Sequence, residues 1–285
     1  MVDIVKASGE KEKFEKDKFC SSLERAGATQ NVVARVCAKV SHDLTEGMNT
    51  EELFRHAFSY LKEEDMPSAV RYSLKRGIFA LGPAGFNFEH YVERIMNIHG
   101  YVTKRNVFMK GVCVEHEIDI VAEKGDEHFI VEVKYHNEQG TKTDVTVAMY
   151  TDARLSDIAP AEEEKERGWK ARHRAWLVTN TKFTSSAIQY GKCRNIKMIG
   201  WRYPHGEGLE DFITAKKIYP VTILPSVGRG ELEALARKNV ILVQDLVSYT
   251  PEYISREFGI PEKRAGALIA EAYVCLTEKH DKNHE

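Results

Sequence analysis

Three side chains in the middle of the chain, Asp119, Glu132 and Lys134, have the types and the spacing to do chemistry together. They lie on two runs of alternating apolar and polar residues that are separated by Gly125-Asp126, a pair typical of a tight type II′ hairpin turn. A two-residue turn there places Asp119 directly opposite Glu132, with their Cβ atoms roughly 5 Å apart. Two carboxylates at that separation repel by roughly 3 kcal/mol at an effective dielectric constant of about 20. A shared divalent cation reverses the sign of that energy, so the pair predicts a site for Mg²⁺ or Mn²⁺.

The amine completes the set. Lys134 lies two residues beyond Glu132, so both side chains leave the strand on the same face. There the ammonium could orient or help deprotonate an attacking water and stabilise charge that develops on a phosphorane, while the cation polarises the phosphate. The three residues are therefore sufficient for hydrolysis of a phosphodiester without a covalent intermediate.

The strands that position these side chains must also bury a face. The same register gives one continuous apolar ladder, in which Ile118 faces Val133, Ile120 faces Val131 and Ala122 faces Phe129. The alternative is an ordinary hairpin whose outer face carries Glu, Asp and Lys as solubilising charges. The register argues against that interpretation, because an exposed face would more naturally place a lysine opposite the acids.

Around this hairpin the pattern predicts a multidomain α+β protein with three parts. Residues 1–84 open with a hairpin-like stretch and continue as helices, with apolar residues three and four apart. Residues 86–205 alternate between helices and strands around a central mixed sheet. In that part we expect a helix over 144–158, followed by a charged loop. Residues 220–278 are helical again.

Composition excludes several classes and selects none. The five cysteines are odd in number and scattered, which fits neither a disulfide framework nor a zinc site. No run approaches the roughly 18 apolar residues that span a bilayer, and the first residues lack the apolar core of a signal peptide, so we expect no membrane association and a cytoplasmic location. A net charge of −2 means that any nucleic-acid binding depends on a local patch. One candidate patch is the basic cluster Lys165, Arg167, Lys170, Arg172 and Arg174.

The central segment resembles the PD-(D/E)xK nuclease superfamily, and most closely its Mrr-type restriction endonuclease domain. The resemblance rests on Phe88-Glu89, Ile118-Asp119 and Val131-Glu-Val-Lys134, followed by strand and helix segments as far as about residue 203. It implies that Asp119 and Glu132 are metal ligands, that Lys134 is the catalytic lysine, and that Glu89 is an accessory carboxylate. Glu117 departs from the pattern, because many relatives have glycine there.

The C-terminal part resembles a tandem helix-hairpin-helix module, in which glycine-containing turns expose N–H groups to phosphates. The resemblance implies DNA contacts at two turns, formed by Val227, Gly228 and Gly230 and by Gly259, Ile260 and Lys263. A module of this kind that only mediates protein contacts is the alternative.

The N-terminal part resembles the ATP-cone, the regulatory nucleotide-binding module of ribonucleotide reductases. The residues that match its motif are Lys6, Gly9, Lys11, Phe14 and Lys18, and the resemblance implies that they hold ATP or dATP. Ala7 departs from the pattern, since an arginine is usual there. Without the resemblance, these lysines are simply a basic surface. No Walker A loop is present in the sequence, so hydrolysis of ATP by a P-loop mechanism is not supported.

Together these features predict a Mg²⁺-dependent DNA endonuclease that an adenine nucleotide regulates by changing its oligomeric state, so the expected partners are DNA, the nucleotide and further copies of the chain in a homo-oligomer. One alternative is a nucleotide-responsive DNA-binding regulator with an inactive nuclease core. Another is a nuclease specific for junctions or flaps in DNA repair.

Overall fold

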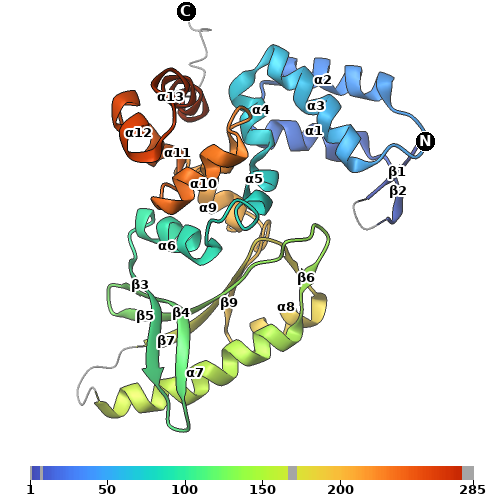
Figure 1. The fold of residues 1–285 in the computed structure, drawn as a ribbon. Helices are drawn as coiled ribbons and strands as arrows, with labels where there is room; N and C mark the ends of the chain where they lie inside the picture. Colours follow the sequence, from blue (N-terminus) through green and yellow to red (C-terminus); the bar gives the residue numbers. More distant parts are fainter. Residues whose placement is uncertain (1, 7–8, 166–171, 278–285) are drawn as a thin grey trace, which may run out of the picture. The chain divides into compact units, whose positions relative to one another are not determined.

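The computed structural model describes residues 2–6, 9–165 and 172–277. The chain forms two compact units (Figure 1). One unit comprises Met1–Gly85 together with Tyr219–Glu285, and the other comprises Phe86–Ile218. The N-terminal and C-terminal segments thus share one unit, and the division into three functional domains stays a prediction.

The N-terminal segment begins with the hairpin that the sequence predicts. Strands β1 (Asp3–Val5) and β2 (Lys11–Lys13) pair antiparallel. The helices that follow are α1 (Lys16–Arg25), α2 (Gln30–Asp43), α3 (Thr50–Glu64), α4 (Met66–Tyr72) and α5 (Leu74–Ala80). Their apolar faces form one core around Leu23, Val36, Ala57 and Leu61, as the three-and-four spacing requires.

One expectation for this segment is wrong. Cys20 of α1 and Cys37 of α2 form a disulfide, although the odd and scattered cysteines gave no sign of a pair. Spacing along the sequence could not show it, because the contact depends on how two helices pack.

The C-terminal segment is helical, as predicted. It contains the 3₁₀ helix η1 (Val221–Ile223) and the helices α10 (Arg229–Arg237), α11 (Val243–Leu246), α12 (Pro251–Phe258) and α13 (Glu262–Leu276). This segment joins α5 through a close backbone approach. The Thr222 hydroxyl donates to the carbonyl oxygen of Gly77 at 2.7 Å, and a Cβ at Gly77 would lie 2.4 Å from a methyl carbon of Ile223. Glycine is therefore required at position 77 for this contact.

The second unit is built on a five-stranded mixed sheet with the strand order β3-β4-β5-β7-β9. The strands are β3 (Val102–Lys110), β4 (Glu115–Lys124), β5 (Glu127–Lys134), β7 (Arg172–Thr179) and β9 (Lys197–Ile199). The first three are antiparallel to one another, whereas β5, β7 and β9 are parallel. Strand β5 is the point where the two halves of the sheet meet. Two further short strands, β6 (Lys142–Thr143) and β8 (Lys182–Phe183), pair separately.

Helices cover this sheet and fix its strands (Figure 1). Helix α6 (Phe88–Ile98) packs against β3, β4 and β5, and α7 (Val145–Lys165) and α8 (Ser185–Cys193) pack on one another and on β7 and β9. A core of Ala148, Leu177, Ala187 and Met198 joins these last two helices to the sheet. The unit ends after α9 (Leu209–Ala215), where the carbonyl oxygen of Ile218 accepts a hydrogen bond of 2.6 Å from the buried Tyr91 hydroxyl of α6.

The structure corrects one predicted boundary. Helix α7 was expected to end near residue 158, but it continues through Pro160 to Lys165. A proline inside a helix removes one backbone hydrogen bond and does not by itself end the helix. In the part of the chain that the structure describes, no helix combines the length and the apolar character needed to cross a membrane.

Candidate active site

The hairpin that carries the candidate site has the predicted register from its turn as far as Ile120 and Val131. Gly125 adopts a φ of 62° at the first central position of the turn, as a type II′ turn requires. From the turn onward, Lys124 pairs with Glu127, and the ladder ends with Ile120 opposite Val131. The apolar residues of the ladder are buried, as predicted.

Beyond Ile120 the two strands part, and Asp119 lies at the fork. One carboxylate oxygen of Asp119 accepts a hydrogen bond of 2.7 Å from the backbone N–H of Val133. The side chain thus takes the place of a backbone acceptor from β4. On β3, the other neighbour of β4, Asn106 has a φ of 52°, so β3 is also distorted near this position.

The parted strands change the packing of one ladder residue. Ile118 was expected on the face of Ile120, but it packs in a small core with Ile130 and Ile158 of α7. Since β5 no longer holds this part of β4 by backbone hydrogen bonds, the segment can turn toward the helix.

Glu132 is a largely buried carboxylate that forms an ion pair with Arg154. An oxygen of Glu132 lies 2.6 Å from Nη1 of Arg154 on α7, and the two side chains are only 16% and 14% exposed. Arg154 also donates to the Tyr150 hydroxyl and lies over the Tyr150 ring, with 4.2 Å from its guanidinium carbon to the ring centroid. Its Nε is buried without a partner among the described residues. The guanidinium is therefore held beside Glu132 by one turn of α7.

Burial dominates the electrostatics of the acids. It raises the pKa of Glu132 to about 7, with a further contribution from the Asp119 carboxylate, and these effects outweigh the opposing effect of Arg154. Burial likewise raises the pKa of Asp119, in spite of the hydrogen bond from Val133. It also raises the pKa of Glu89, again with the Asp119 carboxylate as the next cause. Burial is thus the first cause of the raised pKa of all three acids, and the Asp119 carboxylate adds to it at Glu132 and Glu89.

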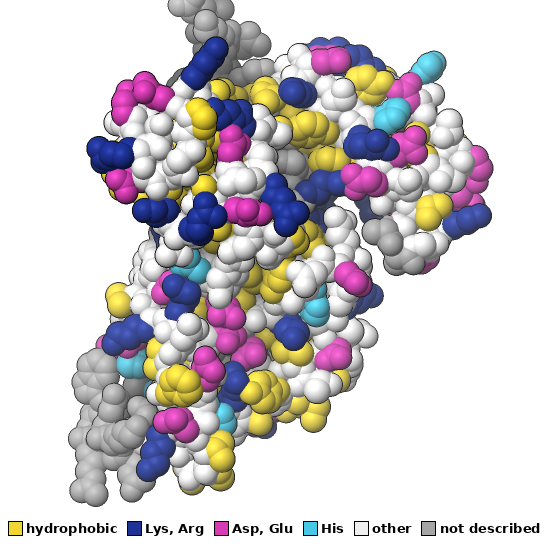
Figure 2. All heavy atoms as spheres, in the orientation of Figure 1, with side chains coloured by type: hydrophobic (Ala, Val, Ile, Leu, Met, Phe, Trp, Pro, Cys, Tyr) yellow, Lys and Arg dark blue, Asp and Glu magenta, His cyan; other side chains and the backbone are white. Residues whose placement is uncertain are grey.

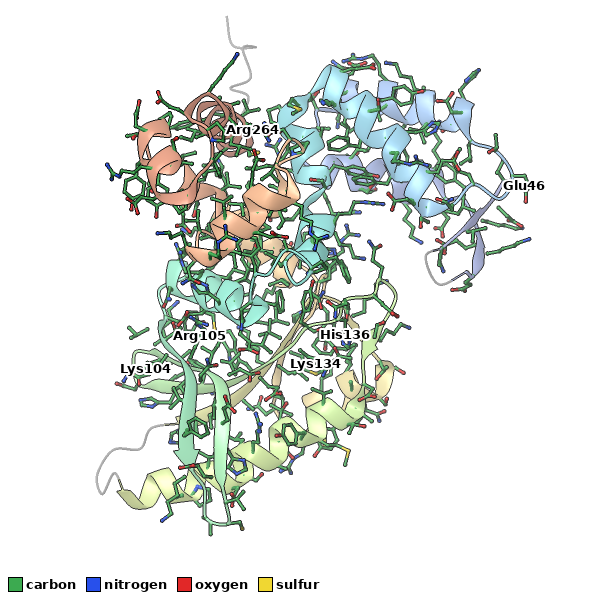
Figure 3. The ribbon with its side chains drawn as sticks, in the orientation of Figure 1. Glu46, Lys104, Arg105, Lys134, His136 and Arg264 are labelled. Carbon is green, nitrogen blue, oxygen red and sulfur yellow. A yellow bond between two sulfur atoms is a disulfide. The ribbon has the colours of Figure 1, made fainter. Side chains whose placement is uncertain are left out.

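The four residues predicted to be catalytic are thus brought together from three elements. Glu89 comes from the first turn of α6, Asp119 from β4, and Glu132 and Lys134 from the end of β5. Lys134 is exposed, and Figure 3 shows it beside His136 where β5 ends. Glu117, the departure from the family pattern, is exposed on β4 and is near enough to raise the pKa of Asp119.

A polar network holds the end of β5 behind Lys134. The side chain of Asn180 accepts from the backbone N–H of His136 at 2.9 Å and donates to its carbonyl oxygen at 2.8 Å. The His136 ring lies 2.8 Å from the Thr143 hydroxyl of β6, and this hydroxyl donates to Thr179 of β7 at 3.0 Å. The buried amide of Asn180 therefore continues the pairing of β5 after the regular ladder has ended.

Sequence reasoning missed Arg154 and Asn180. Arg154 lies 22 residues after Glu132 on a helix, and no local pattern links a helix position to a strand. Asn180 directly follows β7, and the only signal in the sequence was a polar residue at the carboxyl end of a buried parallel strand.

The donor set is compatible with a divalent metal, although it is small. Two carboxylates at one fork offer the hard oxygen ligands that Mg²⁺ and Mn²⁺ prefer. Within the described residues, no group of three or more His, Cys, Asp or Glu side chains is arranged to hold a metal ion. The remaining ligands would have to come from water, backbone carbonyl oxygens or a substrate phosphate, as is common for Mg²⁺.

Comparison with known proteins gives the family. A family model described as "Restriction endonuclease" matches residues 83–201, and a second model described as "AF1548-like, C-terminal" matches residues 219–274. An uncharacterized protein of Archaeoglobus fulgidus is 40% identical over 179 residues, which are 63% of this chain and 96% of the relative. The chain belongs to the AF1548-like family. The crystal structure of AF1548, a protein of unknown function, is 40% identical, covers 65% of this chain and 95% of its own, and superposes with a TM-score of 0.53.

The restriction endonuclease-like domain that the sequence predicted is thus confirmed, and such a domain suggests a nuclease that acts on DNA. The C-terminal segment of this AF1548-like protein has a family of its own. The ATP-cone and the helix-hairpin-helix module stay predictions.

The residues predicted to bind a nucleotide lie on or beside the β1–β2 hairpin, and carboxylates surround them. The Lys6 ammonium lies 2.7 Å from Glu12 and 3.2 Å from Glu10, and Lys18 lies 3.6 Å from Glu15. Gly9 is in the turn with a φ of 80°, Lys11 is exposed, and the Phe14 ring packs on Phe19 with 5.7 Å between centroids. A nucleotide phosphate would have to displace these glutamates from the lysines.

The first predicted DNA contact of the AF1548-like C-terminal segment is already satisfied within the chain. The N–H of Gly228 donates to Glu231 at 2.7 Å, and Arg264 donates to the same carboxylate at 2.6 Å and 2.9 Å. These hydrogen bonds lower the pKa of Glu231. Val227 is partly buried, and Gly230 is exposed in the first turn of α10.

The second turn leaves more room for a ligand. Gly259 ends α12 with a left-handed φ of 70°, Ile260 is buried at 3% exposure, and Lys263 is exposed in the first turn of α13. Of the basic cluster predicted at 165–174, only the side chain of Arg174 falls within the described residues, and it pairs with Glu127 at 3.0 Å.

Proposed function

We propose that this protein is a metal-dependent DNA endonuclease whose active site consists of Asp119, Glu132 and Lys134, with Glu89 as an accessory carboxylate. The observation that carries the proposal is the fork between β4 and β5. There burial raises the pKa of Asp119 and of Glu132, and the Asp119 carboxylate raises that of Glu132 further, beside an exposed lysine and within the segment that matches the restriction endonuclease model. Burying like charges together is costly unless a cation joins them.

Each residue would have a distinct role in this reaction. Asp119 and Glu132 would hold the divalent cation, which when bound would polarise the scissile phosphate and its attacking water. Lys134 would orient that water or take up its proton and would counter the negative charge that develops at phosphorus. Asn180 would keep Lys134 in place, because it fixes the backbone of the same strand end at His136.

Arg154 is the cation that Glu132 already has. With one guanidinium nitrogen on Glu132 and another on Tyr150, the side chain neutralises part of the acidic cluster before any metal binds. A guanidinium matches the geometry of phosphate oxygens. Arg154 would thus pair with Glu132 in the metal-free protein and with a substrate phosphate once the metal is bound.

DNA binding must come from local features of the surface. On the face shown in Figure 2, Lys and Arg side chains alternate with Asp and Glu, in keeping with the net charge of −2. We therefore expect a small number of phosphate contacts. The affinity for DNA should fall with salt concentration in proportion to that number.

Cleavage of supercoiled plasmid tests the proposal. We expect nicked and linear products with Mg²⁺ or Mn²⁺, none with EDTA, and cleavage about 10³-fold slower with Lys134→Ala. Lys182→Ala, which removes an exposed lysine of β8 in the same unit, is the matched control and should cleave normally. If the wild type binds DNA but does not cleave it with either metal, the protein is a DNA-binding regulator with an inactive core. A panel of branched and linear DNA then shows whether a cleaving enzyme prefers junctions.

We propose further that an adenine nucleotide regulates the enzyme through the N-terminal segment. The support is the hairpin with Lys6, Gly9 and Lys11 followed by helices, which has the element order that the resemblance implies. Sedimentation and cleavage with and without ATP or dATP test this proposal. A changed oligomeric state that Lys6→Ala abolishes is expected, and identical profiles and rates would exclude it.

The C-terminal segment is proposed to anchor DNA without reading its sequence. The turn at Gly259 supports this role, because its flanking Lys263 is exposed at the start of a helix. Lys263→Ala should weaken binding of unrelated DNA sequences by the same factor and reduce the salt dependence. An unchanged affinity would favour a role in protein contacts.

A further inference from the structure

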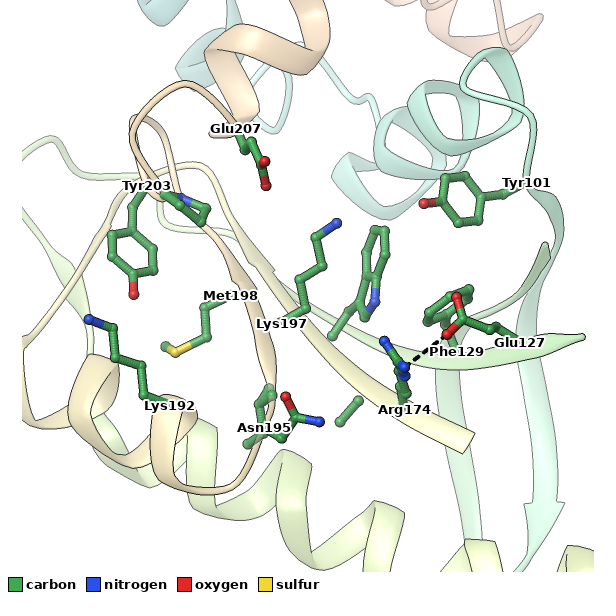
Figure 4. A pocket seen from close by; sticks show the side chains of 14 residues that line it. Tyr101, Glu127, Phe129, Arg174, Lys192, Asn195, Lys197, Met198, Tyr203 and Glu207 are labelled. Carbon is green, nitrogen blue, oxygen red and sulfur yellow. Dashed lines mark ion pairs between the residues drawn. The ribbon is translucent and has the colours of Figure 1, made fainter. Parts of the chain in front are cut away.

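A cavity of about 400 Å³ opens on the other face of the central sheet, among residues that the nuclease reaction does not use (Figure 4). It lies where β5, β7 and β9 begin, and all the residues that line it belong to the second unit. Lys197, which reaches into the cavity, lies in register with Trp176 and Val131, and Glu132 follows Val131 on the opposite face of the sheet. The two sites are therefore separate.

Aromatic rings form part of the floor and walls of the cavity, among charged and amide side chains. Phe129 and Trp176 are buried at 4% and 3% exposure, and their ring centroids are 5.0 Å apart. Tyr101 and Tyr203 are partly exposed on the walls, and in Figure 4 they stand on opposite sides of the cavity. A ligand inside would meet flat apolar surfaces, as a planar ring does in its binding sites.

A lysine that forms no ion pair among the described residues reaches into this setting. The Lys197 ammonium lies 4.3 Å from the centroid of Trp176 and 5.8 Å from that of Phe212, and Figure 4 shows it directed to the middle of the cavity. Within the described chain Lys197 forms no ion pair with a carboxylate, although Glu207 and Glu127 are near enough to affect it. Burial lowers its pKa, so the charge is held in a poorly solvated place, where an added anion would be strongly attracted.

Two more basic side chains, Lys192 and Arg174, border the same space, together with the amide of Asn195. Lys192 and Asn195 come from the end of α8 and the turn after it. Arg174 comes from β7 and pairs with Glu127 at 3.0 Å. A purely apolar ligand would make no use of the ammonium groups of Lys197 and Lys192. A bare inorganic anion would leave most of the volume and all of the aromatic surface unused.

We propose that this cavity binds a nucleoside monophosphate, with its phosphate on Lys197 and its base between the aromatic walls. The chemistry is the same whether the ligand is a free nucleotide or a nucleotide at the end of a DNA strand. The proposal does not depend on the nuclease assignment, because no residue of the acidic cluster takes part in it.

Tryptophan fluorescence in EDTA measures this binding, since Trp176 is in contact with the proposed site. We expect AMP to change the fluorescence with saturation. Adenosine and inorganic phosphate should each bind at least tenfold more weakly, which corresponds to about 1.4 kcal/mol. A short single-stranded oligodeoxynucleotide with a 5′ phosphate, titrated in parallel, identifies the source: tighter binding than AMP indicates a strand end, and weaker binding indicates a free nucleotide.

Variants separate this site from the others. Lys197→Met keeps an apolar stem over Trp176 but removes the charge, and it should weaken AMP binding about tenfold, whereas Lys197→Arg should restore most of it. Lys182→Ala should bind AMP like the wild type, because this residue does not border the cavity. The proposal is overturned if neither AMP nor the oligonucleotide gives a saturable change, if phosphate alone binds as well as AMP, or if Lys197→Met binds like the wild type.

Discussion

The two faces of the central sheet place opposite charges in partly buried settings. On one face, burial and the Asp119 carboxylate raise the pKa of Glu132 and of Glu89. On the other, Lys197 of the parallel strand β9 is half-buried over aromatic rings, in register with Trp176 and Val131, and burial lowers its pKa. Neither group has the full complement of opposite charge that its burial demands.

The difference shows which charge each site lacks. A shortage of positive charge among acids favours a cation, and Arg154 supplies only part of it. A shortage of negative charge around a buried ammonium favours an anion, and Glu207 lies too far away to form an ion pair within the described residues. The sign of the uncompensated charge, more than the shape of either site, therefore predicts the class of ligand.

The largest expected effect removes chemistry from the acidic site alone. Lys134→Ala should lower the rate of plasmid cleavage by about 10³-fold, because no other described amine occupies the end of β5, and the loss of one electrostatic catalyst costs roughly this much. Thermal unfolding should be nearly unchanged, since Lys134 is exposed. A rate within tenfold of the wild type would remove Lys134 from the active site.

The next effect concerns stability and pH in the metal-free protein. The pKa of Glu132 is raised from 4.5 to about 7. Below pH 4.5 the carboxyl is protonated in both the folded and the unfolded chain and costs nothing. As the pH rises to about 7 the unfolded chain releases the proton first, so the free energy of unfolding falls, by up to about 3 kcal/mol.

Denaturant unfolding at a series of pH values checks this prediction. Glu132→Gln should flatten the decline between pH 4.5 and 7, and saturating Mg²⁺ should reverse it in the wild type. Identical pH profiles for the wild type and Glu132→Gln would show that Glu132 is not the group responsible.

A smaller effect tests whether Arg154 is a partial substitute for a metal. Arg154→Met keeps much of the side-chain volume but leaves Glu132 without its cation, and it should destabilise the metal-free protein by about 2 kcal/mol near pH 7. The loss should shrink at pH 5, where Glu132 takes up a proton. Added Mg²⁺ should raise the melting temperature of this variant more than that of the wild type. An equal rise in both would mean that Arg154 and the cation do not share a site.

The smallest effect distinguishes position from chemistry. Asn180→Ala removes both side-chain hydrogen bonds to the backbone of His136 and should lower the free energy of unfolding by about 1–2 kcal/mol. Cleavage should fall through the rate constant, with little change in the pH profile, because the catalytic groups remain present. Asn180→Asp, which restores one acceptor, should recover part of the activity. A shifted pH profile would instead indicate a direct role in proton transfer.

The sequence predicts the hairpin that carries the site well because its register is local. The turn at Gly125 and the alternation on both sides of it determine which residues of β4 and β5 face each other as far as Ile120 and Val131. Beyond them the predicted pairing of Asp119 with Glu132 is wrong, because Asp119 accepts a hydrogen bond from the backbone of Val133 instead. The helical segments at both ends also follow from apolar spacing. Their assignment to an ATP-cone and a helix-hairpin-helix module rests on resemblance and awaits the experiments above.

The features that sequence reasoning missed all depend on tertiary packing. Arg154 contacts Glu132 only because of where α7 packs on the sheet, and Cys20 contacts Cys37 only because α1 packs against α2. The cavity around Lys197 draws its walls from segments that lie as much as 106 residues apart, from Tyr101 to Glu207. Ile118 changes sides because of the strand fork, which a strict period of two cannot express.

The hydrogen bond from Val133 to Asp119 determines which substitution at position 119 is informative. The same carboxylate that is proposed to ligate a metal also caps the open end of a β-ladder, so an alanine there would remove a ligand and an architectural acceptor at once. Asparagine retains an oxygen for the Val133 amide while it removes the negative charge. The amide isostere is therefore the substitution that separates lost catalysis from a frayed sheet.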